Sequence, residues 1–184
     1  MTTTQVVLPA ATYNIDPVHS SVHFKVRHMM ISNVRGEFGK VTGTVKIDPA
    51  NPAASAVTVE IDVNSINTRE PQRDAHLKSE DFLHAEKHSV MRFESTKVEE
   101  TGTGTHKVTG NLTIRGVTRP VVLSVDGPTP AGKDPWGNVR IGAEATTKIS
   151  RKDFGLTWNQ MLETGGVLVG DEIEISIDVQ LIQA

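Results

Sequence analysis

Two stretches of this chain alternate apolar and polar residues one for one. The apolar positions of the two stretches are Val57, Val59, Ile61 and Val63, and Ile173, Ile175, Ile177, Val179 and Leu181. A period of two indicates β-strands with one dry face and one wet face. Several such strands must close on themselves or cover their edges, because an open edge can pair with other chains. What the chain does therefore depends on what the dry faces enclose.

The composition fits a single domain over residues 1–184 with an aliphatic core. A chain of 184 residues buries about 70% of its unfolded surface. Only 4% of the residues are aromatic, so valine, isoleucine, leucine and alanine must fill the core. The net charge of −3, with both signs interspersed, argues against a protein that binds nucleic acid. The absence of cysteine excludes disulfides and thiolate metal sites.

Residues 1–11 have neither the basic region nor the apolar run of a signal peptide. No window of the chain contains the roughly 20 apolar residues that span a bilayer. We therefore expect a cytoplasmic protein without stable membrane insertion, or a periplasmic one if a signal peptide has been removed. Residues 1–11 are expected to be a loosely ordered extension.

The expected strands follow one another with short breaks. They are 12–15, 20–29, 33–48, 56–66, 90–99, 106–115, 118–126, 139–150 and 171–182. Gly36, Gly39 and Gly43 predict a bend or bulge in the long strand that contains them. Residues 70–84 are rich in charged side chains and predict a short helical insertion across the mouth of the sheet. The pattern predicts an all-β fold, an elongated antiparallel up-and-down barrel of about eight strands.

A barrel of about eight strands has an interior just wide enough for side chains or for one small ligand. Small aliphatic walls favour a long, slender apolar guest, although the same residues could pack into a solid core. The expected wall positions, all on the apolar parity, are Val22, Phe24, Val26, His28, Val59, Ile61, Phe93, Leu112, Ile141 and Ala143.

The histidines do not predict a metal site. His19 and His23 lie roughly 13 Å apart along a strand, too far to share an ion. His28 lies on the opposite parity and is expected to be buried or to line the mouth. His84 and His88 are four residues apart, but no third ligand accompanies them, and we expect a surface pair.

Asp16, His19 and Ser20 suggest a catalytic triad, but successive residues of an extended segment point to opposite faces. A nucleophile elbow is absent from the sequence. We expect instead that Asp16 begins a turn and that the His19–Ser20 pair fixes it through side-chain hydrogen bonds. No catalytic residue and no cofactor is predicted.

Three arginines are candidates for binding a head group: Arg69, Arg73 and Arg151. If the helical insertion and the loop at residues 151–154 share one mouth, these guanidinium groups can meet an anionic or polar group there. The alternative is a set of surface ion pairs.

A series of short motifs spans the chain from Tyr13 to the C-terminus. They are Tyr13-x-Ile15-Asp16-x-x-His19-Ser20-x-Val22-x-Phe24-x-Val26-x-His28, Ser65-Ile66-x-Thr68, Arg73-Asp74-x-His76-Leu77, Asp81-Phe82, Gly110-x-Leu112-Thr113-Ile114-x-Gly116-Val117-Thr118, Arg151-x-Asp153-Phe154-Gly155 and Gly170-Asp171-Glu172-Ile173. In this order they resemble the YceI-like family of lipid- and polyisoprenoid-binding proteins. The resemblance implies a lipocalin-like barrel that holds a long-chain amphiphile in its lumen, with no cofactor and no catalytic residue.

We therefore expect non-enzymatic binding, storage or transport of a polyisoprenoid, an isoprenoid quinone or a fatty-acid-like lipid. One alternative is an enzyme that acts on a hydrophobic substrate at the barrel mouth through His28, His76 or an arginine. Another is a stress or interaction scaffold with a solid lumen. A homodimer is compatible with long strands that pair at an edge or a mouth.

Overall fold

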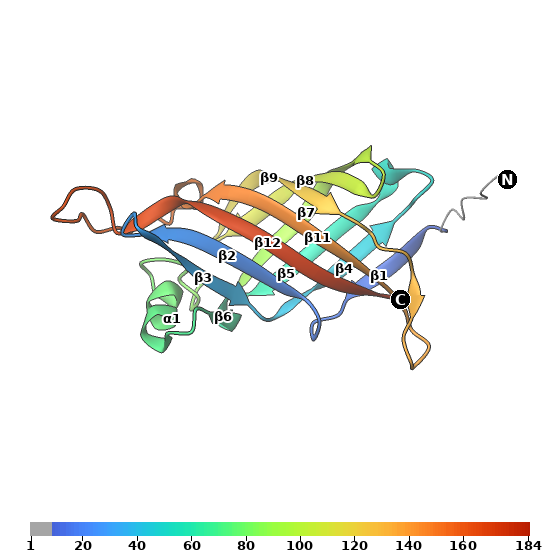
Figure 1. The fold of residues 1–184 in the computed structure, drawn as a ribbon, viewed down its shortest axis with the longest axis horizontal. Helices are drawn as coiled ribbons and strands as arrows, with labels where there is room; N and C mark the ends of the chain where they lie inside the picture. Colours follow the sequence, from blue (N-terminus) through green and yellow to red (C-terminus); the bar gives the residue numbers. More distant parts are fainter. Residues whose placement is uncertain (1–8) are drawn as a thin grey trace.

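Twelve strands pair into one antiparallel sheet, and the pairing of β11 with β12 closes this sheet into an elongated barrel (Figure 1). The computed structural model describes residues 9–184. The strands are β1 Ala11–Ile15, β2 Ser21–His28, β3 Ser32–Phe38, β4 Val41–Ile47, β5 Ala56–Asp62, β6 Ile66–Asn67, β7 Val90–Gly102, β8 Thr105–Ile114, β9 Val117–Asp126, β10 Gly132–Lys133, β11 Val139–Ser150 and β12 Val169–Gln183. The helices are α1 Pro71–Lys78 and the short 3-10 helices η1 Pro52–Ala54, η2 Val63–Ser65 and η3 Arg151–Phe154.

Several of these strands are two halves of one pass through the barrel wall. β1 and β2 both pair with β12, one after the other, so the segment between them interrupts a single pass. β3 and β4 meet at a bend that contains Gly39, and η2 separates β5 from β6. Counted in this way, the chain makes eight antiparallel passes, which confirms the predicted up-and-down barrel.

The barrel wall opens between β9 and β11. These strands pair only from Ser124 to Asp126, so the earlier part of β9 has β8 on one side alone. Pro120 lies in this unpaired part, where the missing N–H costs no ladder hydrogen bond. The 3-10 helix η3 packs against β9 there and places the ring of Phe154, 2% exposed, inside the barrel. Helix η3, whose sequence lacks the alternation of a strand, thus completes the barrel wall.

The helical insertion occupies the first part of the predicted segment. Helix α1 begins at Pro71 with Glu70 as its N-cap, and the backbone N–H of Ser79 donates to the carbonyl of His76 at its end. The predicted short helical insertion near residues 70–84 is confirmed, and after Lys78 the chain continues in turns in which His84 has a positive φ of 50°. These turns bury Phe82, Leu83 and Ala85 against the barrel, whereas α1 itself has no buried residue and covers the mouth from outside.

The expected extension at residues 1–11 overlaps the first strand. Residues 1–8 lie outside the described residues. Ala11, however, already belongs to β1 and lies opposite Ile47 of β4, so the expectation was wrong for this residue.

The corner between β1 and β2 is held by a buried carboxylate. Asp16 Oδ1 accepts the backbone N–H of Val18 at 3.0 Å, and Oδ2 lies 2.8 Å from His19 Nδ1 and 2.6 Å from Arg140 Nη1. The hydroxyl of Ser20 turns away and bonds to the backbone of Gln180. The expected turn is confirmed for Asp16 and His19, whereas Ser20 links the corner to β12. Ser20 does not bond to His19, so the triad geometry is absent.

We expect Asp16→Asn to lower the free energy of unfolding at pH 7 by about 2 kcal/mol. The hydrogen bonds from His19, Arg140 and Val18 hold the pKa of Asp16 at about 2 in the folded protein, against about 3.9 in the unfolded chain. Because the folded pKa is the lower one, this stabilisation is complete above about pH 4 and is lost as the pH falls towards 2. Urea unfolding at a series of pH values measures it.

Asp178→Asn is the control, because Asp178 is exposed and a change there should cost less than about 0.5 kcal/mol. A gap between wild type and Asp16→Asn that stays constant from pH 5 to pH 2 would contradict the assignment.

Candidate functional site

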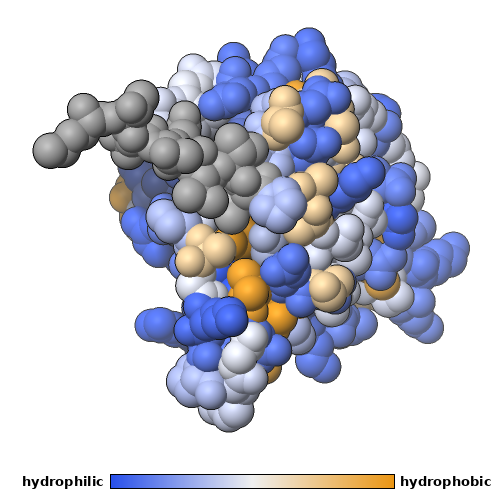
Figure 2. All heavy atoms as spheres, turned by 90° about the vertical axis from the view of Figure 1, so that its right-hand side faces the viewer, coloured by the Kyte–Doolittle hydropathy of each residue, from blue (hydrophilic) through white to orange (hydrophobic). Residues whose placement is uncertain are grey.

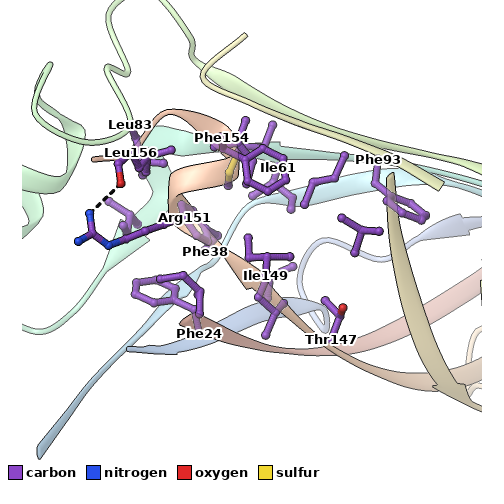
Figure 3. A pocket seen from close by; sticks show the side chains of 18 of the residues that line it. Phe24, Phe38, Ile61, Leu83, Phe93, Thr147, Ile149, Arg151, Phe154 and Leu156 are labelled. Atoms are coloured by element: carbon purple, nitrogen blue, oxygen red, sulfur yellow. Dashed lines mark hydrogen bonds between the residues drawn. The ribbon is translucent and has the colours of Figure 1, made fainter. Parts of the chain in front are cut away.

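An apolar cavity of about 190 Å³ lies inside the barrel at the end covered by helix α1. Aromatic rings and aliphatic side chains from nearly every strand surround it, as Figure 3 shows. Apart from Thr147 and Arg151, every lining residue is apolar. Thr147 donates its hydroxyl to the carbonyl of Val122 across the wall opening, so it presents no free donor to the cavity. The cavity therefore offers a guest apolar contact.

A second cavity of about 140 Å³ lies towards the other end of the barrel. Four residues line both cavities: Val59, Leu123, Ile177 and Val179. The second cavity is also mainly apolar, with Ser55, His106 and Glu144 as its polar lining residues. His106 Nδ1 is 3.0 Å from the carbonyl of Gly127. The two cavities thus follow one another along the barrel and share one set of walls.

Two glycines leave room for the aromatic rings of the first cavity. A Cβ at Gly36 would collide with the ring of Phe24 on the neighbouring strand, and a Cβ at Gly110 would collide with the ring of Phe93. Each ring therefore lies against a stretch of wall that has no side chain. Since the rings lie along the wall, the centre of the barrel stays open.

Most of the expected wall positions line a cavity. The first cavity is lined by Val22, Phe24, Val26, Val59, Ile61, Phe93 and Leu112, and the second by Val59 and Ala143. Two positions differ. Ile141 is buried in the core at 3% exposure, outside both linings, and half-buried His28 lies at the end of β2, beyond the first cavity.

Other lining residues were not among the expected positions. On β12 these are Val169, Ile173, Ile175, Ile177 and Val179, most of which the alternating pattern already placed on one face. Phe154, at the end of η3, and Leu156, in the irregular loop after it, also line the cavity, and no periodic signal could have identified them.

The structure brings the helical insertion and the loop of Arg151 to one mouth, but the guanidinium of Arg151 serves the fold. It is 3% exposed and donates to four backbone carbonyls at 2.7 to 3.2 Å. These carbonyls belong to Leu156, Trp158, Val169 and Gly170. In Figure 3 the group points away from the apolar side chains towards the carbonyl of Leu156. Arg151 thus ties the loop after η3 to the start of β12.

The remaining head-group candidates lie beside α1. Arg73 donates from Nε to the hydroxyl of Thr68 at 2.8 Å and from Nη2 to its carbonyl at 2.7 Å. Asp74 accepts from the N–H and the hydroxyl of the same threonine, so Arg73 helps to fix the start of the helix. Arg69 is exposed in the preceding turn with a positive φ of 65°. Head-group binding by Arg69 or Arg73 stays a prediction.

An aromatic cluster attaches helix α1 to the opposite rim of the mouth. The ring of His76 makes edge contacts with Phe82 and Trp158, at centroid distances of 5.0 and 4.7 Å. Its Nε2 is 2.8 Å from Asp81 Oδ2. Such edge contacts contribute about 0.5–1.5 kcal/mol each beyond burial. Leu77, on the same helix, lines the cavity, so this segment is its cover.

The part of the chain that the structure describes contains no group of three or more His, Asp or Glu residues placed to hold a metal ion. His84 and His88 face each other at a ring centroid distance of 5.9 Å, and both are partly exposed. Between residues 9 and 184, no helix has the length and apolar character needed to cross a membrane.

Comparison with known proteins identifies the fold and the family together. The YceI-like domain matches residues 13–181, nearly the whole chain. This chain belongs to the YceI family. A UPF0312 protein of Vibrio cholerae is 43% identical over 149 residues, which cover 80% of this chain and 78% of the relative. The resemblance seen in the sequence is thereby confirmed.

Solved structures show the same barrel. The YCEI protein of Campylobacter jejuni is 32% identical, with a TM-score of 0.72 over 86% of this chain and 90% of that one. A polyisoprenoid binding domain from Saccharophagus degradans is only 15% identical, and its TM-score is 0.67 over 95% and 99% of the two chains. At that identity the likeness concerns the fold alone.

Proposed function

We propose that this YceI-family protein binds a long-chain amphiphile in its lumen, with the apolar chain along the two cavities and the polar head at the mouth beside helix α1. The observation that carries the proposal is the row of two adjoining apolar cavities with shared walls. Each buried CH₂ group contributes about 0.8 kcal/mol, so affinity would grow with chain length. Polyisoprenoids, isoprenoid quinones and fatty-acid-like lipids all fit this description.

The residues that line the two cavities support binding of a lipid and not catalysis. Around the first cavity the polar side chains are Thr147 and Arg151, and both have their donors engaged with backbone carbonyls. In the second cavity, His106 Nδ1 is engaged by the carbonyl of Gly127, and the side chains of Ser55, His106 and Glu144 form no hydrogen bond with one another. None of these groups forms a nucleophile and base pair within hydrogen-bond reach of another, which covalent or acid–base catalysis would need.

Extraction of the purified protein with organic solvent, followed by mass spectrometry, tests the proposal. We expect a lipid with a long unbranched or isoprenoid chain in about equimolar amount. A second assay adds octaprenol from ethanol to lipid-free protein and follows the tryptophan fluorescence, to which Trp158 at the mouth contributes. A protein that yields no lipid and also takes up neither octaprenol nor a long-chain fatty acid would refute the proposal.

A further inference from the structure

Two hairpins at the mouth end of the barrel expose large apolar side chains, the first at its tip and the second at its base. The turn between β2 and β3 exposes Met29 at 42%, Met30 at 58% and Ile31 at 73%, and the loop before β12 exposes Met161 at 83%. The sulfur of Met30 lies against Gly166 of that loop, so the two hairpins form one surface. Figure 1 shows both hairpins at the same end of the long axis. A clustered apolar tip of this kind marks an interaction site, whereas isolated apolar residues do not.

The backbone of the first tip shows that methionine is an unusual choice there. Met29 and Met30 have φ angles of 51° and 60°, and the N–H of Ile31 donates to the carbonyl of His28 at 3.1 Å. This is a type I′ turn, which strongly prefers Asn-Gly because both central residues need positive φ. Two methionines hold this conformation against their intrinsic preference, and strain of this kind points to a function of the side chains.

The second hairpin is ordered at its base, where Met161 lies. Met161 and Val167 form a β-bridge, and the N–H of Leu168 donates to the carbonyl of Gln160 at 2.9 Å. The side chain of Asn159 bonds to both the N–H and the carbonyl of Val169. The exposed Met161 is therefore presented by an ordered hairpin.

Basic side chains lie behind the first tip on the outer face of the β2–β3 ribbon. Arg27 is exposed and donates from Nη2 to the carbonyl of Met30, and Lys25 lies directly opposite Arg35. Glu174 neutralises Lys25 at 2.7 Å, and Glu163 is the carboxylate of the second hairpin. An apolar tip with arginines behind it suits a bilayer, where the tip enters the apolar layer and the cations meet anionic head groups.

We propose that this end of the protein docks on the surface of an anionic lipid bilayer through Met29, Met30, Ile31 and Met161. This surface is continuous with the first cavity. Val169 lines that cavity and pairs with His28, the residue that precedes Met29 in the chain. Docking would place the mouth against the membrane from which an amphiphile enters. Docking on a bilayer needs only the exposed apolar side chains of the two hairpins and the charges near them. It does not depend on whether the lumen holds a lipid.

Flotation with vesicles of phosphatidylglycerol and phosphatidylcholine tests the docking surface. The variant Met29→Asn/Met30→Gly/Ile31→Thr removes the apolar tip and supplies the pair that a type I′ turn prefers, so it should fold at least as well. We expect this variant to bind the vesicles at least tenfold more weakly than wild type. Wild type should bind less at 0.5 M salt or on pure phosphatidylcholine, because the arginines contribute.

Trp136→Ala is the matched control. Trp136 is 81% exposed but lies in the β10–β11 loop at the far end of the barrel, about 43 Å from the tip along β12. Figure 2 shows that far end, which is mostly hydrophilic. We expect Trp136→Ala to bind vesicles as wild type does. Equal loss in both variants, or full binding by the tip variant, would overturn the proposal.

Further outcomes separate this inference from the proposed function. If wild type ignores vesicles while the tip variant abolishes self-association or capture of another protein, the surface serves a protein partner and the proposal is overturned. If the tip variant still takes up octaprenol from ethanol but no longer from vesicles, docking is supported. If wild type floats with vesicles yet takes up no octaprenol, docking stands and lumen binding fails.

Discussion

Arg151→Met is expected to lower the free energy of unfolding by at least about 4 kcal/mol. The substitution removes the donors of four backbone carbonyls, and each buried acceptor that loses its partner costs about 1–3 kcal/mol. Burial lowers the pKa of the guanidinium, and Asp171 at 3.6 Å counters part of this effect. Urea unfolding followed by the fluorescence of Trp158, whose own carbonyl is a partner of Arg151, measures the loss.

Two further variants test whether the loss of stability comes from the hydrogen bonds of the Arg151 guanidinium. Lys152→Met lies on the same 3-10 helix with its side chain 56% exposed and should cost less than about 1 kcal/mol. Arg151→Lys should recover little, because a single ammonium cannot reproduce the planar fork that reaches four carbonyls. If Arg151→Met leaves stability unchanged and weakens only lipid binding, Arg151 is a head-group residue after all.

Val179→Phe is expected to weaken the binding of octaprenol by about 100-fold or more. Val179 lines both cavities, so a larger ring there should separate them and exclude part of a long chain. Exclusion of about four carbons at roughly 0.8 kcal/mol each corresponds to about 3 kcal/mol, or more than 100-fold in Kd. Titration of lipid-free protein with octaprenol, followed by fluorescence, gives the two affinities.

The matched control is Asp178→Phe, which adds the same ring one residue away on the outer face of β12. Its affinity for octaprenol should stay within about threefold of wild type. Farnesol, whose chain is much shorter, should lose less than tenfold in Val179→Phe. Equal losses for both alcohols would mean that the substitution distorts the barrel and does not divide the lumen.

The sequence predicted the faces of the strands better than the ends of the elements. Val22, Phe24 and Val26 line the cavity as their parity requires, because alternation along a strand is a local property. His28 shares that parity and still misses the cavity, since it lies where β2 runs past the barrel interior. Parity assigns a face, but position along the barrel axis comes only from the register with β12.

The candidate site depended more on long-range contacts. The sequence left open whether Arg151 and the helical insertion share one mouth, and the structure places both there. Two of the four carbonyl partners of Arg151 lie in the irregular loop after η3 and two at the start of β12, up to 19 residues away, so no spacing could have identified them. Arg151, which the sequence suggests as a head-group ligand, is thus hydrogen-bonded to backbone carbonyls instead.

By itself, the sequence determined that the chain forms an antiparallel barrel with an aliphatic interior, because period-two alternation and short breaks leave few other ways to bury the dry faces. Only the tertiary structure decided that this interior is partly empty. The rings of Phe24 and Phe93 could have filled the lumen, but Gly36 and Gly110 on neighbouring strands let them lie along the wall. That outcome depends on which residues face each other across strands, and alternation along one strand does not fix this register, which the turns of the β2–β3 and β7–β8 hairpins set.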